Sequence, residues 1–524
     1  MQRARSRRLL ARSCLARSCL ALGVITSGSG AGSAQTVTRA QVEARLPALE
    51  AMAQQAVDAG AVPGLAVAVV HGDETLYLKG FGVRQAGTPD TVDPDTVFQI
   101  ASLSKPVTAT IVAALVGEGI VDWESRVADL DPAFQLHEPY PTAQVTVRDF
   151  LSHRSGLPGL AGDDLEGIGF GRDAILRRLR LVPPASSFRA GYAYSNFGFT
   201  EGAVAAAKPT GQSWETVARE KLFAPLGMNA TGTTHAAFLS RTNRAALHVR
   251  ADGVWTAAVA RNPDAQAPAG GVSAPIRDLA QWLRLVIGNG RFAGRQQIAA
   301  EALAQTHAPL MARGRSPVTG GATFYGLGWT IAYDRHGLVW GHAGAFSAGA
   351  QTLVSIHPEA GFGILVLTNA FPSGVPEGLA DSFADLVFDG RVGQDWVKVW
   401  GAAYESLFEP GIAADTAAYG APPARASAPL ALAAYTGRYA NAYVGDAVVT
   451  EADGVLTLTV GPDGARRYPL RHFDRDLFLS FPDAEAPGRP SAIRFAIGRD
   501  GRAAAMTVNA LDANGLGTLA RRAD

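Results

Sequence analysis

Cysteine is almost absent from this chain of 524 residues. Its two cysteines, Cys14 and Cys19, both lie near the amino terminus, in a segment rich in arginine. If that segment is removed, the remaining chain has no disulfide, no thiol nucleophile and no cysteine ligand for a metal. Such a protein must be held together by its hydrophobic core, which a chain of this length can build.

Outside the amino-terminal segment the sequence also lacks a long uncharged apolar run, which argues against a stable membrane span. It carries no net charge, because 47 basic residues balance 47 acidic ones, so there is no electrostatic case for binding nucleic acid. No dense His/Asp/Glu cluster, phosphate loop or dinucleotide fingerprint stands out, and we predict no metal and no cofactor. The expected partner is a small-molecule or peptide substrate, and the oligomeric state stays open.

Residues 1–34 have the pattern of an export signal. Six arginines up to Arg17 precede a modest apolar patch, Cys19–Ile25, and small residues then continue to Ala34. Ser6–Leu10 resembles a twin-arginine signal, although an ordinary secretory signal explains the pattern equally well. Both interpretations predict a periplasmic or secreted protein.

Residues 40–410 predict one α+β domain. Two apolar runs, Leu65–Val70 and Thr75–Gly80, are joined by a short polar turn and predict a β-hairpin. A helix is expected before this hairpin, over residues 39–60, and a mostly helical middle follows it, with helices over residues 169–181 and 276–287. Strand-like runs return between Tyr325 and Thr368, the first of them over residues 325–332, and Glu377–Phe388 predicts a helix. The simplest architecture is an antiparallel sheet built from both ends of the domain, with a helical insertion between them.

The last part of the chain has a different pattern. Residues 411–430 are rich in alanine and proline and predict a linker. Residues 431–524 contain short apolar runs separated by Gly-Asp, Asp-Gly and Pro-Asp pairs. Closely spaced strands of this kind predict a small all-β sandwich or barrel.

The stretch Phe98–Pro106 contains the pair around which we interpret the rest of the chain. Ser102 and Lys105 are three residues apart, which places them on one face of a helix, one turn apart. A serine hydroxyl is a weak nucleophile unless a base lies beside it, and a lysine is a base only when its amine is uncharged. Burial, or the positive end of a helix dipole, would lower the pKa of the amine from about 10.4.

Lysine itself is scarce, since only 5 of the 47 basic residues are lysines. Where a positive charge suffices the chain uses arginine, which cannot lose its proton in a protein. Lys105 is the one lysine with a serine three residues before it. The pair alone is still a weak signal, because a helix-capping serine followed by a solvated lysine explains it at least as well.

Two further motifs follow in chain order. Tyr194-Ser195-Asn196 offers a phenol that can relay a proton and an amide that can orient the lysine or hold a substrate carbonyl. The same spacing recurs at Tyr439–Asn441, which we interpret as structural. His342-Ala343-Gly344 lies in a predicted strand, where a glycine would let a substrate backbone approach closely. The alternative is a strand with an ordinary surface histidine.

The order Ser-x-x-Lys, Tyr-x-Asn, His-x-Gly resembles the serine β-lactamase and penicillin-binding-protein superfamily, in its class C β-lactamase and D-alanyl-D-alanine carboxypeptidase branch. The resemblance covers roughly residues 42–388 and includes the phrases Leu151–Leu157, Gly270–Ser273 and Tyr325–Trp329. It implies a β-lactamase/transpeptidase-like antiparallel sheet with a helical subdomain. The segment after the linker is similar, more weakly, to the small lipocalin-like barrels appended to some members.

Carried over to this chain, the resemblance implies that Ser102 attacks a carbonyl and forms an acyl-enzyme. Lys105 and Tyr194 would share the general-base and general-acid work. Asn196 would orient Lys105 and the substrate amide. The substrate would be an amide or an ester, such as a D-amino-acid peptide, a β-lactam or a short ester.

The resemblance also implies that the backbone N–H groups of Ser102 and Ala345 form an oxyanion hole, with His342 and Gly344 on the strand that flanks the substrate. The sequence departs from β-lactamases of this family, which usually have Lys-Thr-Gly in place of His342–Gly344. A fixed positive charge for a β-lactam carboxylate is therefore missing. The alternative function is a non-catalytic or slowly acylating protein that binds β-lactams or peptidoglycan fragments.

Overall fold

The computed structural model describes residues 37–251, 253–257, 260–482 and 489–523. The predicted export signal, with both cysteines, lies outside the described residues. Among the helices that are described, none is both long enough and apolar enough to cross a bilayer.

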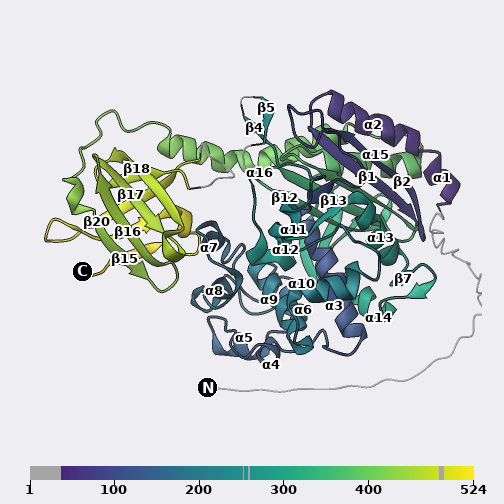
Figure 1. Cartoon of the computed structure of the whole chain (residues 1–524), viewed down its shortest axis with the longest axis horizontal. Coiled ribbons are helices and arrows are strands. Elements are labelled where there is room, and N and C mark those ends of the chain that lie inside the picture. Colours follow the sequence, from purple (N-terminus) through teal and green to yellow (C-terminus); the bar gives the residue numbers. More distant parts are fainter. Residues whose placement is uncertain (1–36, 252, 258–259, 483–488, 524) are drawn as a thin grey trace, which may run out of the picture. The chain divides into compact units, whose positions relative to one another are not determined.

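An eight-stranded antiparallel sheet forms the centre of the chain up to residue 389 (Figure 1). The first two strands form the predicted hairpin, and the first of them also pairs with the last strand of this region. The sheet is therefore built from both ends, as the sequence predicts. The strand predicted over residues 325–332 is instead divided between two strands. Gly328, with a φ of 76°, turns the chain between them. In spatial order the strands are β2 (Glu74–Gly82), β1 (Gly64–His71), β14 (Phe362–Thr368), β13 (Ala350–His357), β12 (Gly337–Phe346), β11 (Thr330–Asp334), β10 (Ala322–Tyr325) and β9 (Met311–Arg315).

Helices cover both faces of the sheet, because successive side chains of a strand point to opposite faces and those of residues 65–70 in β1 are all apolar and buried. Residues 65, 67 and 69 of β1 belong to one hydrophobic cluster, with side chains from α1 (Arg39–Glu43), α2 (Leu46–Asp58) and α15 (Val375–Asp389). Residues 66, 68 and 70 belong to the other, with α13 (Ile276–Ile287) and α3 (Ser104–Gly117). Burying a valine or leucine fully contributes about 1.5–3 kcal/mol, so the two clusters hold the sheet between its helices.

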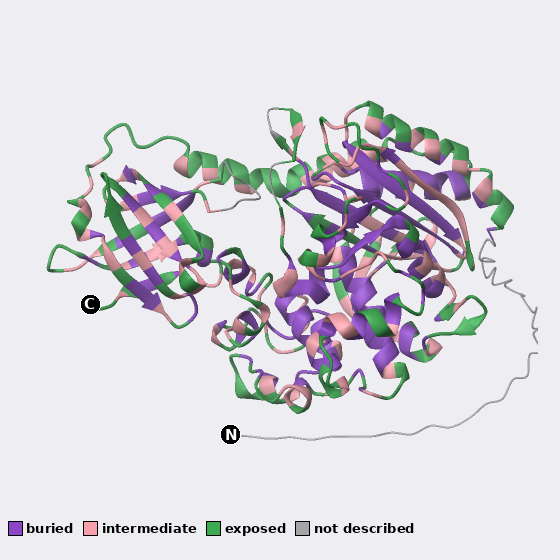
Figure 2. Cartoon of the chain, viewed as in Figure 1, coloured by how far each residue is buried: buried purple, intermediate pink, exposed green. Residues whose placement is uncertain are grey.

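The helix α3 runs through the interior and is buried from Ser104 to Leu115 (Figure 2). This explains why residues 107–116 of its sequence contain no charged residue, since a helix surrounded by protein needs no polar face. Its two buried threonines are hydrogen-bonded. Oγ1 of Thr108 donates to the Pro268 carbonyl at 2.7 Å, and Oγ1 of Thr110 accepts from the Trp282 indole at 3.0 Å.

The helices outside α3 follow the predicted pattern with shorter elements. The expected helix over residues 39–60 is divided into α1 and α2, because Pro47 sits at the start of α2 and cannot continue a helix from before it. The expected helix over residues 169–181 is only α8 (Arg172–Leu176) and a 3₁₀ turn, η2 (Leu179–Leu181). The remaining helices before α15 are α4 (Val127–Leu130), α5 (Pro139–Gln144), α6 (Val147–Leu151), α7 (Asp163–Gly167), α9 (Asn196–Ala207), α10 (Trp214–Ala218), α11 (His235–Leu239), α12 (Ala267–Gly270) and α14 (Ala300–Ala304).

Three small two-stranded sheets complete this region. The strand before the Ser-x-x-Lys motif pairs with the segment that follows the Pro268–Gly271 loop, which brings two distant parts of the sequence together beside α3. The pairs are β3 (Val97–Gln99) with β6 (Ser273–Pro275), β4 (Val249–Ala251) with β5 (Val254–Thr256), and β7 (Arg291–Phe292) with β8 (Arg295–Gln296).

A long helix, α16 (Trp396–Tyr419), includes the first part of the predicted linker. Three side-chain hydrogen bonds join it to α15: from the Trp396 indole to Asp385 at 2.8 Å, from the Trp400 indole to Asp381 at 2.7 Å and from the Tyr404 hydroxyl to Glu377 at 2.6 Å. Residues 420–431 then form neither helix nor strand.

The carboxy-terminal strands form a closed barrel in which each strand pairs with the next and the last closes against the first. The predicted all-β fold is confirmed, and the predicted runs lie in six of the eight strands. Buried aromatic rings, including Tyr435, Phe478 and Phe495, fill the interior. The strands are β15 (Gly437–Asn441), β16 (Gly445–Ala452), β17 (Val455–Val460), β18 (Arg466–Asp474), β19 (Leu477–Ser480), β20 (Ser491–Ile497), β21 (Ala503–Val508) and β22 (Thr518–Arg521).

Candidate active site

Ser102 lies in a 3₁₀ turn, η1 (Ala101–Leu103), that continues directly into α3. The residue before it, Ala101, has a φ of 48°, in the left-handed region. A residue other than glycine in a sparsely populated conformation costs about 1–3 kcal/mol, and such residues cluster at functional sites. Ser102 is partly exposed, whereas Lys105 is buried, so the hydroxyl can meet a substrate while the amine stays out of water.

The amine of Lys105 has three oxygen neighbours. Its Nζ lies 3.1 Å from Oγ of Ser102, 2.8 Å from Oδ1 of Asn196 and 2.9 Å from the carbonyl oxygen of Ala269. Burial lowers the pKa of Lys105 to about 7, although the charge of Asp163 opposes the shift. A large fraction of the amine is therefore neutral near pH 7 and able to accept the serine proton.

Tyr194 and Asn196 reach this amine from the start of α9. The hydroxyl of Ser195 caps the helix by accepting from the N–H of Gly198 at 3.1 Å, which sets the direction of both neighbours. The ring centroid of Tyr194 lies 4.5 Å from Nζ of Lys105. Burial raises the pKa of Tyr194, and its hydrogen bond with Ser102 lowers it, so the phenol keeps its proton. The structure thus brings together all four residues of the first two motifs.

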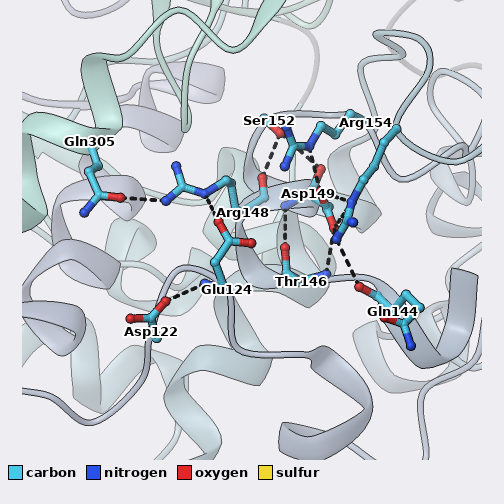
Figure 3. A network of polar contacts seen from close by, with 10 residues as sticks. Asp122, Glu124, Gln144, Thr146, Arg148, Asp149, Ser152, Arg154 and Gln305 are labelled. Carbon is cyan, nitrogen blue, oxygen red and sulfur yellow. Dashed lines mark hydrogen bonds and ion pairs between the residues drawn. The ribbon is translucent and has the colours of Figure 1, made fainter.

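The loop before α9 is held by a buried carboxylate (Figure 3). Asp149 accepts from Nε of Arg154 at 2.6 Å and from the guanidinium of Arg189 at 2.7 Å. Burial alone would raise the pKa of Asp149, but hydrogen bonds from Arg189, Thr146 and Arg154 outweigh it and keep the pKa below its usual value. The phrase Leu151–Leu157 is thereby tied to the segment that carries Tyr194.

His342 is buried and does not present a charge to a substrate. Its Nε2 lies 2.9 Å from the Tyr325 hydroxyl, and its Nδ1 lies 2.6 Å from the carbonyl of Ala343. Burial lowers the pKa of His342 to about 3, so the ring is neutral at pH 7. The exposed residues of this part of β12 are Ala343 and Ala345 instead. The alternative of an ordinary surface histidine is therefore wrong, and the buried ring lies beside Tyr194 and Tyr325, with ring centroids 6.4 Å and 5.8 Å away.

The sequence suggested that Gly344 lets a substrate backbone approach the strand. In the structure it instead lets the protein's own backbone approach. A Cβ at this position would lie 2.3 Å from the Ile100 carbonyl oxygen and 2.7 Å from the Leu103 backbone nitrogen. The space beside the glycine is thus filled by η1. Only a residue without a side chain lets β12 come so close to the turn that carries Ser102.

Replacing Gly344 is therefore expected to disturb the turn. Overpacking typically costs about 1–3 kcal/mol, so Gly344→Ala should lower the Tm in thermal denaturation and reduce activity by displacing Ser102. Gly401→Ala is the matched control, because its Cβ would meet only the Ser373 carbonyl oxygen, at 3.8 Å. An unchanged Tm and activity in Gly344→Ala would contradict this account.

Sequence reasoning missed two groups that contact the site. The carbonyl of Ala269 accepts from Lys105, and Asp163 accepts from Nδ2 of Asn196 at 2.7 Å. The phrase Gly270–Ser273 pointed to the loop of Ala269 but not to a backbone carbonyl. Asp163 gave no signal, because an acidic pair in a polar loop usually lies in solvent.

One group of side chains has ligand atoms close enough together to consider a metal. Among the described residues, His336, Asp385 and Asp389 place one such atom each within 4.8 Å of the others. Arg335 already forms ion pairs with both carboxylates. The two negative charges are balanced by that guanidinium, so we infer no metal there.

Known proteins are similar to this chain over most of its length. A family model described as β-lactamase matches residues 49–387, and a domain of unknown function (DUF3471) matches residues 421–517. The unguisins hydrolase ungD′ of Aspergillus campestris is 29% identical over 417 residues, which are 74% of this chain and 74% of that protein. Penicillin-binding protein 4 of Amycolatopsis lactamdurans is 30% identical over 349 residues, 64% of this chain and 86% of that protein.

A solved structure is similar in fold over most of the chain. The octameric penicillin-binding protein homologue from Pyrococcus abyssi superposes with a TM-score of 0.56, covering 90% of this chain and 99% of that one. The two sequences are 20% identical, so this likeness concerns the fold alone.

Proposed function

Because the chain belongs to the β-lactamase family of serine hydrolases, we propose that it is an exported enzyme that forms an acyl-enzyme on Ser102 with amide or ester substrates. The observation that carries this proposal is the 3.1 Å separation between Nζ of Lys105 and Oγ of Ser102. The amine belongs to a buried lysine whose pKa burial lowers to about 7. Nucleophile and base are therefore adjacent and in usable protonation states.

Acylation begins when Oγ of Ser102 attacks the carbonyl carbon of the substrate and its proton passes to the neutral amine of Lys105. The C–N or C–O bond of the substrate then breaks. The leaving group takes its proton from Lys105 through the phenol of Tyr194. In deacylation a water molecule attacks the acyl carbonyl, its proton moves to the same groups, and the acid leaves as Ser102 is protonated again.

The negative charge that develops on the carbonyl oxygen is held by the backbone N–H groups of Ser102 and Ala345. Amides in the first turn of a helix lack partners within that helix, which leaves the Ser102 N–H available. The close packing of Gly344 against η1 supports this arrangement, since it brings β12 next to Ser102. Losing one such donor typically costs about 10²–10³ in rate. Asn196 orients Lys105 and the substrate amide.

Substrate preference follows from what the strand beside the site offers. β12 presents no positive charge there, because His342 is neutral and faces the interior. This favours short esters, and D-amino-acid peptides cleaved at an internal bond, over β-lactams, whose carboxylate would have no fixed cation on the strand. A hydrolase and a penicillin-binding protein stand among the relatives, which supports a carbonyl substrate.

The same proposal divides the chain into four parts. Residues 1–34 are an export signal, residues 40–410 the hydrolase domain, residues 411–430 a linker and residues 431–524 a lipocalin-like barrel. The barrel and the eight-stranded sheet have separate strand sets, which supports the division. An exported protein without disulfides depends on the two hydrophobic clusters of its sheet.

Labelling with a fluorophosphonate tests the proposal. We expect one covalent adduct on the intact protein by mass spectrometry, and peptide mapping should place it on Ser102. Ser406→Ala, which removes an exposed hydroxyl on α16, should label like the wild type. A wild-type protein that acquires no adduct from a fluorophosphonate or a penicillin would favour a binding protein that does not acylate.

A further inference from the structure

A carboxylate lies directly behind the amide that orients Lys105. Nδ2 of Asn196 donates to Oδ2 of Asp163 at 2.7 Å, while Oδ1 of the same amide lies 2.8 Å from Nζ of Lys105. The other oxygen of the carboxylate, Oδ1 of Asp163, is shielded from solvent and has no hydrogen-bond partner among the described residues. Carboxylate, amide and amine thus form one connected row that ends at Ser102.

This row determines which end of the amide faces the lysine. An ionised carboxylate can only accept hydrogen bonds, so Asp163 selects the NH₂ group of Asn196. The amide oxygen is then turned toward Lys105. In the opposite orientation two N–H donors would point at an amine that must itself receive a proton.

Asp163 also acts on Lys105 through its charge. Its carboxylate opposes the burial that lowers the pKa of Lys105 to about 7. Burial raises the pKa of Asp163 to about 7, while the hydrogen bond from Asn196 opposes that shift. Both groups therefore change charge over the same pH range. Among the described residues, the other titratable or charged groups that interact with this pair are Glu166 on α7, His153, Tyr194, Arg261, His342 and Tyr443.

The short helix that begins at Asp163 is also one of the places where the carboxy-terminal barrel contacts the rest of the chain. The Tyr443 hydroxyl donates to Oδ1 of Asp164 at 2.6 Å. Nε of Arg466, on β18, donates to the carbonyl of Gly167 at 3.1 Å, and Nε of Arg178 donates to the carbonyl of Tyr443 at 3.0 Å. A helix of one turn cannot hold its own shape, so these contacts stabilise it.

We propose that Asp163 is a positioning residue, which fixes the orientation of the Asn196 amide and the charge on Lys105, and that the carboxy-terminal barrel holds its turn in place through Tyr443. Asp163 touches neither the substrate nor the reacting atoms. It acts through Asn196, and the barrel acts through the neighbouring Asp164. The inference rests on the proposed acyl-enzyme at Ser102.

The pH dependence of p-nitrophenyl acetate hydrolysis tests the first part. In the wild type, kcat/KM should rise with pH through about 7, because only the neutral amine of Lys105 accepts the serine proton. Asp163→Asn removes the negative charge and so lowers the pKa of Lys105. The rising part of the pH profile of kcat/KM, its acid limb, should therefore move to lower pH by about one unit. A purely structural role would lower the Tm and leave the limb in place.

Two further variants make the result decisive. Asp129→Asn removes an exposed carboxylate on α4 and should leave the limb where it is in the wild type. If Asp163→Asn does not fold, Asp163→Ser removes the same charge with a smaller side chain and should show the same shift. An unmoved limb in a folded, active Asp163 variant overturns the inference. Failure of the wild type to acylate would instead overturn the proposed function.

A pair of tyrosine variants tests the role of the barrel. Tyr443→Phe removes the hydroxyl that holds Asp164 and should lower kcat several-fold with little change in KM. Tyr439→Phe is the matched control, since its hydroxyl bonds only within the barrel region, to the Tyr435 carbonyl at 2.6 Å and from Arg521 at 2.8 Å. It should lower the Tm but keep kcat. Equal kcat values in the two variants would contradict a role for the barrel in catalysis.

Discussion

Ser102→Ala is expected to abolish turnover of ester and peptide substrates while leaving the fold intact. Removal of a serine nucleophile costs hydrolases on the order of 10⁶-fold in kcat, so residual activity should be close to background. The side chain is partly exposed and loses only one oxygen, which predicts a Tm near that of the wild type. Steady-state hydrolysis of p-nitrophenyl acetate, with thermal denaturation of the same sample, measures both.

The same variant separates the proposed enzyme from its alternative. An acyl-enzyme requires Oγ of Ser102, so adducts from a fluorophosphonate or a penicillin should disappear together with turnover. A non-covalent binding protein would retain its affinity for β-lactams in Ser102→Ala. Turnover that persists at the wild-type level would mean that another residue is the nucleophile.

Lys105→Arg is expected to show that the amine matters as a base and not as a charge. Arginine keeps the positive charge but cannot deprotonate in a protein. A positioned base contributes roughly 10²–10⁴-fold, and we expect kcat to fall by at least that factor. Pre-steady-state measurements should show that the rate of acylation has fallen, because Ser102 then has no acceptor for its proton.

Two further variants control for changes in packing and for the replacement of lysine by arginine. Lys105 is fully buried, so the larger arginine could disturb the site, and Lys105→Met provides an uncharged side chain of similar length. Both variants should be inactive with measurable cooperative unfolding. Lys79→Arg changes an exposed lysine that pairs with Glu50 and should leave kcat unchanged. Wild-type kcat in Lys105→Met would refute the assignment of the base.

Much of the fold was predictable because its signals are local. The hairpin of β1 and β2 could be identified from two apolar runs and a polar turn, and α13 begins and ends at the residues its periodicity indicates. The barrel followed from short apolar runs with turn residues between them. Elements whose sequence lacks a clear hydrophobic pattern were less well predicted. Pro47 divides the first predicted helix, and β9 is mostly exposed and was not predicted as a strand.

The sequence by itself determined which residues are candidates for the chemistry. The spacing of Ser102 and Lys105 and the Tyr-x-Asn pair are properties of one turn each, and one turn of helix places such neighbours without help from the rest of the chain. The family resemblance, confirmed by the match over residues 49–387, also rested on these short motifs.

Only the tertiary structure decided how those groups are tuned. The pKa of Lys105 depends on burial by segments far away in the sequence, among them the carbonyl of Ala269 and the amide of Asn196. Gly344 serves the backbone of η1 and His342 pairs with Tyr325, neither of which its own motif reveals. Asp163 and Tyr443 are brought behind the site by folding alone. Solvation and charge are set by whatever the fold packs around a group, and a linear motif does not contain that information.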